Sequence, residues 1–177
     1  MKEKIRGSVW RFGSNVDTDQ IIPAEYLTTG DEKELARHAF EKAKPGFAKD
    51  VRPGDVIVAD ENFGSGSSRE HAPRALMGAG IACVVAKSFA RIFYRNSINI
   101  GLPVVETDIE AGDGDLMEID FREGKIRNIS KNREASFPPM PPFLQKLIEV
   151  GGLVEYTKKR LKEKGVPEEQ IHYEKYY

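Results

Sequence analysis

The residues best suited to chemistry lie in the stretch NFGSGSSREHAPRA, residues 62–75. Three Ser and two Gly run directly into Arg69, Glu70 and His71. At the start of a helix, unpaired backbone N–H groups and the positive end of the helix dipole favour anions. Arg69 adds a planar fork of donors that can bind a carboxylate through two hydrogen bonds. The pattern therefore favours a site for a carboxylate substrate.

Other Gly-rich motifs do not fit this stretch. It lacks the Gly-Lys-Ser/Thr of a phosphate-binding Walker A loop and the third Gly of a dinucleotide fingerprint, and no register gives GxSxG. One alternative stays open, because Ser67 and Glu70 have the S-x-x-E spacing of a helix capping box, with Arg69 as a solvated surface residue. Pro73 argues for a helix start later than Ser67, since proline removes a hydrogen bond inside a helix.

Several predicted elements precede this stretch and position it. Residues 5–12 alternate in hydropathy as a strand does, and 13–30 form a long polar loop with an apolar centre. Residues 31–43, DEKELARHAFEKA, predict a helix with Asp31 at its N-cap and Glu34 at the capping-box position.

The rest of the chain predicts a mixed sheet. From Val56 on, short Val/Ile-rich runs alternate with segments of helical length, a pattern typical of parallel βαβ units. Residues 116–129 predict a hairpin that turns at Glu123-Gly124. Helices should follow the proline-rich 136–143 segment, with a break at Gly151-Gly152. We therefore predict one α/β domain over residues 1–177, in which about 165–177 form a tail or dock on a partner.

Composition narrows the class of protein. The 177 residues include 27 basic and 28 acidic side chains, so no Lys/Arg excess suggests nucleic acid or an anionic membrane surface. No signal peptide or membrane-spanning run is visible, and we expect a cytoplasmic protein. Cys83 is the only cysteine and lies in an apolar run, which predicts buried packing and leaves no cysteines for a cluster or disulfide. Three histidines without metal-ligand spacing predict no bound metal.

Three segments together carry a resemblance to a known family. They are NVDTDQIIPAEYL, NFGSGSSREHAPRAL and SFARIFYRNSINIGLPVV, in this order. A chain with these motifs resembles the small subunits of isopropylmalate dehydratase, which are relatives of the aconitase swivel domain. The resemblance extends from Val9 to about Pro142. It implies a swivelling β/β/α domain, in agreement with the mixed sheet predicted from the hydropathy pattern.

The resemblance also implies an activity. In this family water is eliminated from a hydroxy di- or tricarboxylate and added back at the neighbouring carbon, in leucine biosynthesis for isopropylmalate. A [4Fe–4S] cluster with one open iron acts as Lewis acid, and its Cys ligands lie on a large subunit. The resemblance thus implies that this chain binds no cofactor itself. It should be active only with a cluster-bearing large subunit, in a heterodimer or a heterotetramer.

The family's residue roles transfer to matching positions of this sequence. Ser67 matches the catalytic base, which takes the proton from the carbon beside a carboxylate, and Ser68 and Arg69 match ligands of the substrate carboxylate. Asp19 matches an acidic residue of the active-site rim that orients basic partners, although a plain turn-forming Asp fits the spacing nearly as well. Supporting roles fall to Gly64, Gly66 and His71.

The loop IIPAEYLTTG should recognise the variable end of the substrate. Relatives that act on an additional carboxylate have an Arg in this region, whereas here Tyr26, Leu27, Thr28 and Thr29 occupy it. A loop without a cation favours an apolar substituent, because an unpaired carboxylate in a closed site is unfavourable. This favours isopropylmalate, with dimethylmalate, citramalate or homoaconitate as alternatives. A non-catalytic anion-binding regulatory module is the alternative from a different class.

The segment SFARIFYRNSINIG predicts a mostly apolar helix with a few polar members. We expect these polar side chains to tie the helix to the Gly/Ser loop rather than to contact substrate. They are Arg91, Arg95, Asn96 and Asn99.

Overall fold

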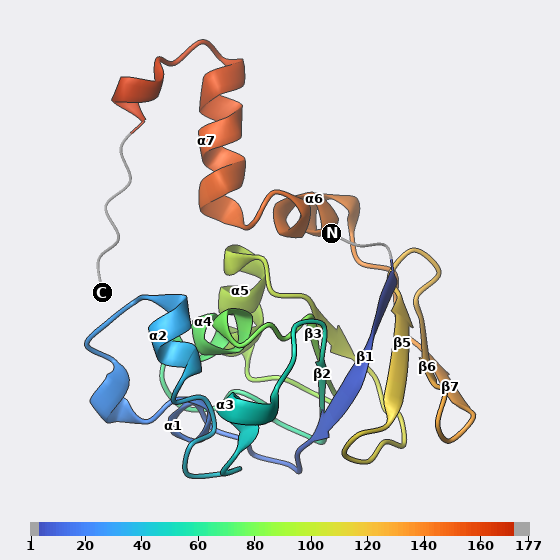
Figure 1. The fold of residues 1–177 in the computed structure, drawn as a ribbon. Helices are drawn as coiled ribbons and strands as arrows, with labels where there is room; N and C mark the ends of the chain where they lie inside the picture. The colour runs from blue at the N-terminus through green and yellow to red at the C-terminus, as the bar shows by residue number, and fades with distance from the viewer. Residues whose placement is uncertain (1–3, 172–177) are drawn as a thin grey trace.

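The computed structural model describes residues 4–171, and within them one mixed sheet of seven strands is covered by helices (Figure 1). The strand order is β4-β3-β2-β1-β5-β6-β7, with parallel pairing from β1 to β4 and antiparallel pairing from β1 through β5 to β7. The predicted mixed sheet with a parallel βαβ half is confirmed. The strands are β1 (Lys4–Arg11), β2 (Val56–Ala59), β3 (Cys83–Ala86), β4 (Val104–Glu106), β5 (Leu116–Asp120), β6 (Lys125–Asn128) and β7 (Arg133–Ser136).

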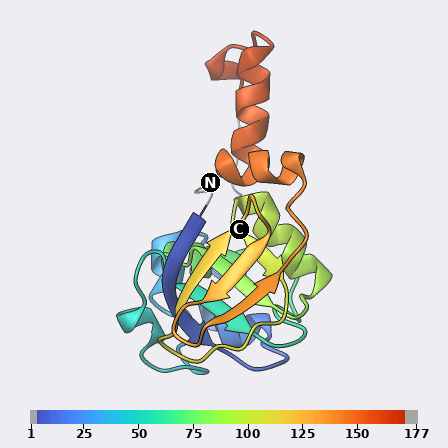
Figure 2. The ribbon, with the colours of Figure 1, turned by 90° about the vertical axis from the view of Figure 1, so that its right-hand side faces the viewer.

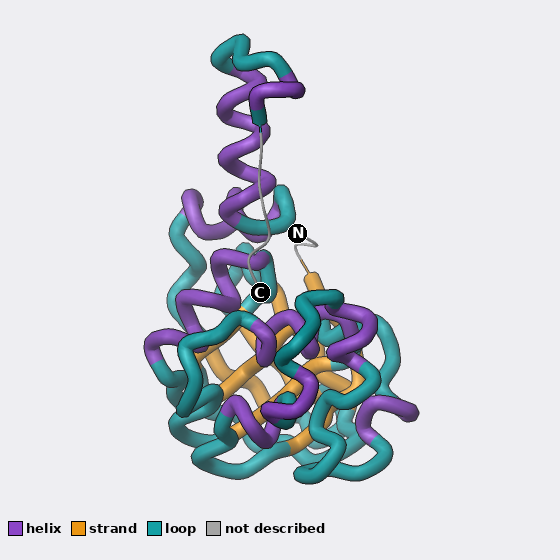
Figure 3. Tube along the Cα trace, turned by 90° about the vertical axis from the view of Figure 1, so that its left-hand side faces the viewer, coloured by secondary structure: helices purple, strands orange, loops and turns teal. Residues whose placement is uncertain are grey.

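Helices cover the parallel half of the sheet on one side, and Figure 3 shows them in front of the strands. No helix within residues 4–171 combines the length and the apolar character that a membrane crossing requires. The helices are α1 (Thr18–Ile21), α2 (Glu32–Ala36), α3 (Phe47–Asp50), α4 (His71–Gly78), α5 (Arg91–Ile100), α6 (Pro142–Glu149) and α7 (Leu153–Glu163), with 3-10 turns η1 (Ala24–Tyr26) and η2 (Glu168–Gln170).

The alternation of side chains along the strands divides the core in two. In β2, Ile57 and Ala59 belong to the cluster that packs under the helices, whereas Val56 and Val58 belong to the other cluster. This second cluster joins residues of the parallel strands to residues of β5 and β6, among them Met117 and Ile126. The antiparallel strands therefore lie against the parallel half and give a β/β/α arrangement (Figure 2).

The predicted hairpin is confirmed between β5 and β6. Asp120 pairs with Lys125 across it, and Gly124 has φ of 64° in the turn. The Asp120 carboxylate accepts hydrogen bonds from the backbone N–H groups of Arg122 at 3.0 Å and Glu123 at 2.9 Å. Side-chain capping of the turn thus fixes the register of the strands.

The helix predicted over 31–43 is wrong in length, because α2 ends at Ala36. Asp31 caps it as expected, accepting from the Glu34 N–H at 2.8 Å. The chain then turns so that Phe40, at φ of 53°, is fully buried, donates its N–H to the Ile21 carbonyl and stacks on Phe12 at 4.2 Å. Burying such a ring stabilises by about 1.5–3 kcal/mol, more than a marginal surface helix would gain from a further turn.

The loop predicted over 13–30 is also more ordered than expected, because it contains α1 and η1. Asp17 caps α1 in a reciprocal capping box with Gln20, with both hydrogen bonds present at 2.8 and 3.0 Å. Aspartate in place of Ser or Thr at the first position concealed this signal in the sequence.

The predicted break between the C-terminal helices is confirmed at Gly151-Gly152, where both φ values are positive. Helix α7 stands out from the body and has no buried residue (Figure 2). The predicted 165–177 tail contains η2, and its residues 172–177 lie outside the described part of the chain.

Candidate active site

Two loops meet at the carboxyl edge of the sheet, one after β1 and one after β2. These strands are parallel neighbours, so their carboxyl ends lie at the same edge. The Gly64 N–H donates to the Val16 carbonyl at 2.7 Å, and the Thr18 N–H donates to the Ser65 carbonyl at 2.8 Å. The VDTDQ and GSGSS segments therefore form one unit paired through the backbone.

Thr18 fixes the position of Ser67 within this unit. Its side chain is buried, and its Oγ1 accepts a hydrogen bond from the Ser67 N–H at 2.9 Å. Sequence reasoning missed this residue. The available signal was its place between the two aspartates of VDTDQ, since a hydroxyl in a paired loop often satisfies a neighbouring backbone donor.

Two glycines allow the loop to approach its neighbours closely. Gly64 has φ of 82°, and a Cβ there would overlap the Phe93 ring. Gly66 has φ of 105°, and a Cβ there would lie 3.0 Å from the Thr18 Oγ1. Other residues would be strained at both positions, so the loop path depends on glycine.

The capping-box interpretation of Ser67 and Glu70 is wrong. Helix α4 begins at His71, its N-cap is Glu70, and no side chain caps it. Pro73 is the third residue of the helix, in the first turn, where a missing N–H leaves no hydrogen bond unmade. The Ser67 Oγ instead accepts from the Arg69 N–H at 3.2 Å, in a local turn. The later helix start considered in the sequence analysis is confirmed.

A small depression brings four of the predicted site residues together. Asp19, Ser67, Arg69 and His71 line it, beside Thr18. The volume is about 10 Å³, whereas sites for small ligands usually enclose about 300–1,000 Å³. These residues thus present one wall of a site rather than a closed pocket. The apolar part of the lining is Ile22, Leu27 and Ala72.

Two residues with charged side chains, Asp19 and Arg69, line this depression. Burial lowers the pKa of the His71 imidazole, and the charges of Arg69 and Arg74 lower it further, whereas a backbone hydrogen bond with Thr29 acts in the opposite direction. His71 is therefore neutral near pH 7. An anion in the depression would meet the exposed Arg69 and the neutral His71 imidazole, with the acidic side chain of Asp19 on the same wall.

Arg74 is paired with carboxylates instead. It is buried in α4, and its guanidinium lies 3.1 Å from Glu70 and 3.5 Å from Glu32 of α2. The pair with Glu32 joins α4 to α2, which follows the loop expected to recognise the substrate, whereas the pair with Glu70 lies within the start of α4.

The other predicted site residues lie outside the lining of the depression. Ser68 and Thr28 are exposed. Thr29 is half-buried, and its Oγ1 accepts from the Asp31 N–H at 3.1 Å, just before α2. Ile22 and Leu27 are the members of the IIPAEYLTTG segment that reach the depression.

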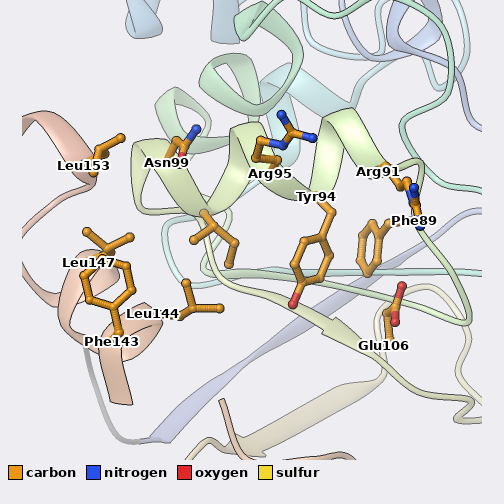
Figure 4. Close-up of a pocket in the computed structure, with 11 residues that line it drawn as sticks. Phe89, Arg91, Tyr94, Arg95, Asn99, Glu106, Phe143, Leu144, Leu147 and Leu153 are labelled. Carbon is orange, nitrogen blue, oxygen red and sulfur yellow. The ribbon is translucent and has the colours of Figure 1, made fainter. Parts of the chain in front are cut away.

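Helix α5 supports the Gly/Ser loop from the other side. The Asn96 Nδ2 donates to the Ser68 carbonyl at 2.8 Å, which confirms for this residue the predicted tie between helix and loop. Arg91, Arg95 and Asn99 instead line an open groove of about 680 Å³ between α5 and α6 (Figure 4).

The described residues do not fit an iron–sulfur cluster. Cys83 is fully buried in β3, and burial raises the pKa of its thiol, whereas a cluster requires several Cys thiolates. Among residues 4–171, no group of three His, Cys, Asp or Glu side chains could hold a metal ion.

Comparisons with known proteins place the chain in a family. The family described as Aconitase C-terminal domain matches residues 54–108, which include the Gly/Ser loop and α5. The 3-isopropylmalate dehydratase small subunit of Thermodesulfovibrio yellowstonii is 56% identical over 161 residues, which cover 89% of this chain and 96% of that protein. The chain belongs to the 3-isopropylmalate dehydratase small-subunit family. The expected swivel-domain resemblance is confirmed.

Members of this small-subunit family share the fold closely. A crystal structure of 3-isopropylmalate dehydratase from Methanocaldococcus jannaschii has a TM-score of 0.85 and 48% identity, covering 92% of this chain and 98% of that chain. The methanogen homoaconitase small subunit of Methanothermobacter thermautotrophicus is 53% identical, covering 91% of this chain and 95% of that protein. Relatives whose names give different substrates are thus almost equally similar in sequence to this chain, at 56% and 53% identity.

Proposed function

We propose that this chain is the small subunit of a hydro-lyase that interconverts 2-isopropylmalate and 3-isopropylmalate by loss and re-addition of water, in leucine biosynthesis. The observation that carries the proposal is the near full-length similarity to small subunits of that name, 56% identical over 89% of this chain. The two backbone-paired loops, which bring Asp19, Ser67 and Arg69 into one depression, support it. We expect the enzyme in the cytoplasm, as the sequence predicts.

The shape of the site supports a requirement for a second subunit. A depression of about 10 Å³ cannot enclose a hydroxy-dicarboxylate, so the remaining walls must come from another surface. We assign that surface to the large subunit, in a heterodimer or a heterotetramer. The [4Fe–4S] cluster expected of the family would lie there and supply Lewis-acid chemistry, since the described residues of this chain do not fit it.

Within this proposal Ser67 is the proton carrier. A serine hydroxyl is a poor base in water, and it acts as one only where donors and positive charge stabilise the alkoxide. The Arg69 N–H donates to Ser67 Oγ at 3.2 Å, and Arg69 lines the same depression as Ser67. The proton leaves the substrate carbon next to a carboxylate. The C–H group on that carbon becomes more acidic when cations and hydrogen-bond donors hold the carboxylate.

The substrate carboxylate is the expected ligand of Ser68 and Arg69. Arg69 can bind the carboxylate through two hydrogen bonds. The neutral His71 imidazole adds no positive charge, so the cation of this pair is Arg69. Asp19, Gly64, Gly66 and His71 are supporting residues that keep the wall in shape. These roles are carried over from the family motif, and the shared depression is what favours them for Asp19, Ser67, Arg69 and His71.

The loop with Leu27, Thr28 and Thr29 favours an apolar substrate end. Leu27 faces the depression, and both threonines are uncharged. Homoaconitate is the second candidate substrate, because a relative named methanogen homoaconitase small subunit is 53% identical to this chain. For that substrate the additional carboxylate would require a cation from the large subunit.

Reconstitution tests the proposed function. The chain is mixed anaerobically with candidate large subunits, and hydration of isopropylmaleate, dimethylmaleate and homoaconitate is followed. We expect turnover of isopropylmaleate only when both subunits are present. Faster turnover of homoaconitate would identify the second candidate, and no turnover with any large subunit would favour an anion-binding module over an enzyme.

A further inference from the structure

The loop expected to recognise the substrate is attached to a distant turn by a compact set of side chains. The Tyr26 ring, in η1, stacks on the His38 ring with centroids 3.6 Å apart and an interplanar angle of 9°. His38 lies just beyond α2, in the turn that replaced the predicted long helix. A tyrosine and a histidine twelve residues apart in sequence thus form one stacked pair.

One carboxylate joins both rings. The Tyr26 hydroxyl donates to Glu41 Oε1 at 3.1 Å, and His38 Nδ1 lies 2.7 Å from Glu41 Oε2. A carboxylate only accepts hydrogen bonds, so His38 donates from Nδ1. The His38 hydrogen bond lowers the pKa of the Glu41 carboxyl, and the Tyr26 hydroxyl adds to this effect, so Glu41 stays ionised near pH 7.

A second tie lies beside the first. Lys42 Nζ contacts both carboxylate oxygens of Glu25, at 2.9 and 3.2 Å. Glu25 and Tyr26 are adjacent in the loop, and Glu41 and Lys42 are adjacent in the turn. Two consecutive residues of the loop therefore contact two consecutive residues of the turn. We call these five residues the loop cluster: Glu25, Tyr26, His38, Glu41 and Lys42.

The turn that carries three of the five residues of the loop cluster is itself fixed to the core. Phe40, between His38 and Glu41, is fully buried, and its N–H donates to the Ile21 carbonyl at 2.8 Å. Its ring also packs against Phe47, with centroids 4.9 Å apart. The cluster thus links a rigid, buried point to a surface loop.

The surface loop leads directly to the candidate site. Leu27, next to Tyr26, lines the depression that also holds Ser67 and Arg69. Thr28 follows it, exposed to solvent. A displacement of η1 would therefore move the loop residue that faces the substrate end while leaving the Gly/Ser loop in place.

We propose that Tyr26, His38 and Glu41 are positioning residues for substrate selectivity, which hold the 24–29 loop at one distance from Ser67. The inference rests on the proposed function, because it takes this loop to contact the variable end of the substrate. Glu25 and Lys42 act in the same way through the second tie. None of these five residues lines the depression with Ser67, so their effect falls on discrimination between substrates rather than on proton transfer.

The test compares variants in the complex with the large subunit. Glu41→Ala removes both hydrogen bonds of the first tie, Tyr26→Phe keeps the ring stack but loses the hydroxyl, and His38→Phe keeps a ring but loses the donor. The matched control is Glu134→Ala, which removes a more exposed ion pair with Arg127, on β6 and β7. The readouts are kcat and KM for isopropylmaleate and for dimethylmaleate.

We expect Glu41→Ala to raise KM for isopropylmaleate about tenfold with kcat changed less than about twofold, and to reduce its preference over dimethylmaleate. Tyr26→Phe and His38→Phe should each give a smaller change in the same direction. The proposal would be overturned if kcat/KM fell equally for both substrates. It would also be overturned if the melting temperature fell without any change in substrate preference. The Glu134→Ala control should have the same kcat and KM for both substrates as the unaltered complex.

Hydrogen exchange of the full chain separates this inference from the proposed function. The Tyr26 N–H donates to the Pro23 carbonyl at 3.0 Å, and the Leu27 N–H donates to the Ala24 carbonyl at 3.2 Å. Both hydrogen bonds belong to the η1 turn. Glu41→Ala should speed exchange of both amides at least about threefold, and Glu134→Ala should not. If the unaltered complex turns over none of the substrates, the proposed function fails, and unchanged exchange in Glu41→Ala would separately contradict the loop cluster.

Discussion

The Gly/Ser loop and the 24–29 loop border the same depression but are held in different ways. The first is fixed by backbone hydrogen bonds to Val16 and Thr18 and by Asn96 from α5. The second is held by exposed and half-buried side chains that reach across to the turn after α2. Buried backbone contacts are hard to change by substitution, whereas exposed side-chain contacts change one residue at a time. The difference suggests that the chemistry is fixed by the fold and the selectivity is adjustable.

The largest effect on the Gly/Ser loop is expected from Gly64→Ala. The new Cβ would overlap the Phe93 ring and occupy a backbone with φ of 82°. We expect a loss of about 2–5 kcal/mol in unfolding free energy and loss of turnover, measured by denaturant unfolding and by activity of the complex.

Gly114→Ala is the control for backbone strain, because Gly114 has φ of 79° but no atom within 4 Å of the new Cβ. It should destabilise by only about 1 kcal/mol. Equal destabilisation of the two variants would show that contact with Phe93 does not constrain the loop.

A smaller effect is expected from Thr18→Val, which keeps the side-chain shape but removes the acceptor for the Ser67 N–H. Leaving that donor unpaired should destabilise by about 1–3 kcal/mol and lower kcat about tenfold or more. Thermal unfolding and steady-state kinetics measure the two effects.

Thr18→Ser restores the hydroxyl and should recover most of the rate. Thr157→Val, at an exposed position of α7, serves as control for the same substitution elsewhere. A normal rate in Thr18→Val would mean that Ser67 is positioned by other contacts.

The smallest effect is expected from Thr28→Arg in the other loop. The new cation should shift the ratio of kcat/KM about tenfold toward homoaconitate over isopropylmaleate, with little change in unfolding free energy, since Thr28 is exposed. Competition between the two substrates in one reaction measures the ratio directly. An unchanged ratio would assign selectivity to the large subunit.

Local patterns allowed much of the fold to be predicted. Alternating Val/Ile runs indicated the parallel half, Glu123-Gly124 the hairpin and Gly151-Gly152 the helix break, because each depends on backbone preferences of nearby residues. The end of α2 at Ala36 could not be predicted in this way. It depends on the contacts of Phe40 with Ile21 and Phe12, which are distant in sequence.

The candidate site likewise contains residues that local patterns predicted and residues that they did not. Ser67 and Arg69 stand out by residue type and spacing, and the structure places them in one depression. Thr18, Glu25 and Tyr26 lie in the segment NVDTDQIIPAEYL, but the segment does not indicate which residues they contact. Their importance arises from pairing between segments that the sequence does not show to be neighbours, as with the Thr18 hydroxyl and the Ser67 N–H.

The central claim is that Ser67 carries the proton and does not merely shape the loop, and Ser67→Ala in the assembled complex tests it most directly. The hydroxyl accepts one hydrogen bond, from the Arg69 N–H, so its removal should lower unfolding free energy by less than about 1 kcal/mol. We predict that kcat for isopropylmaleate falls about 10³-fold while subunit assembly and substrate affinity are retained. A rate within about threefold of the unaltered complex would contradict the assignment of Ser67 as the base.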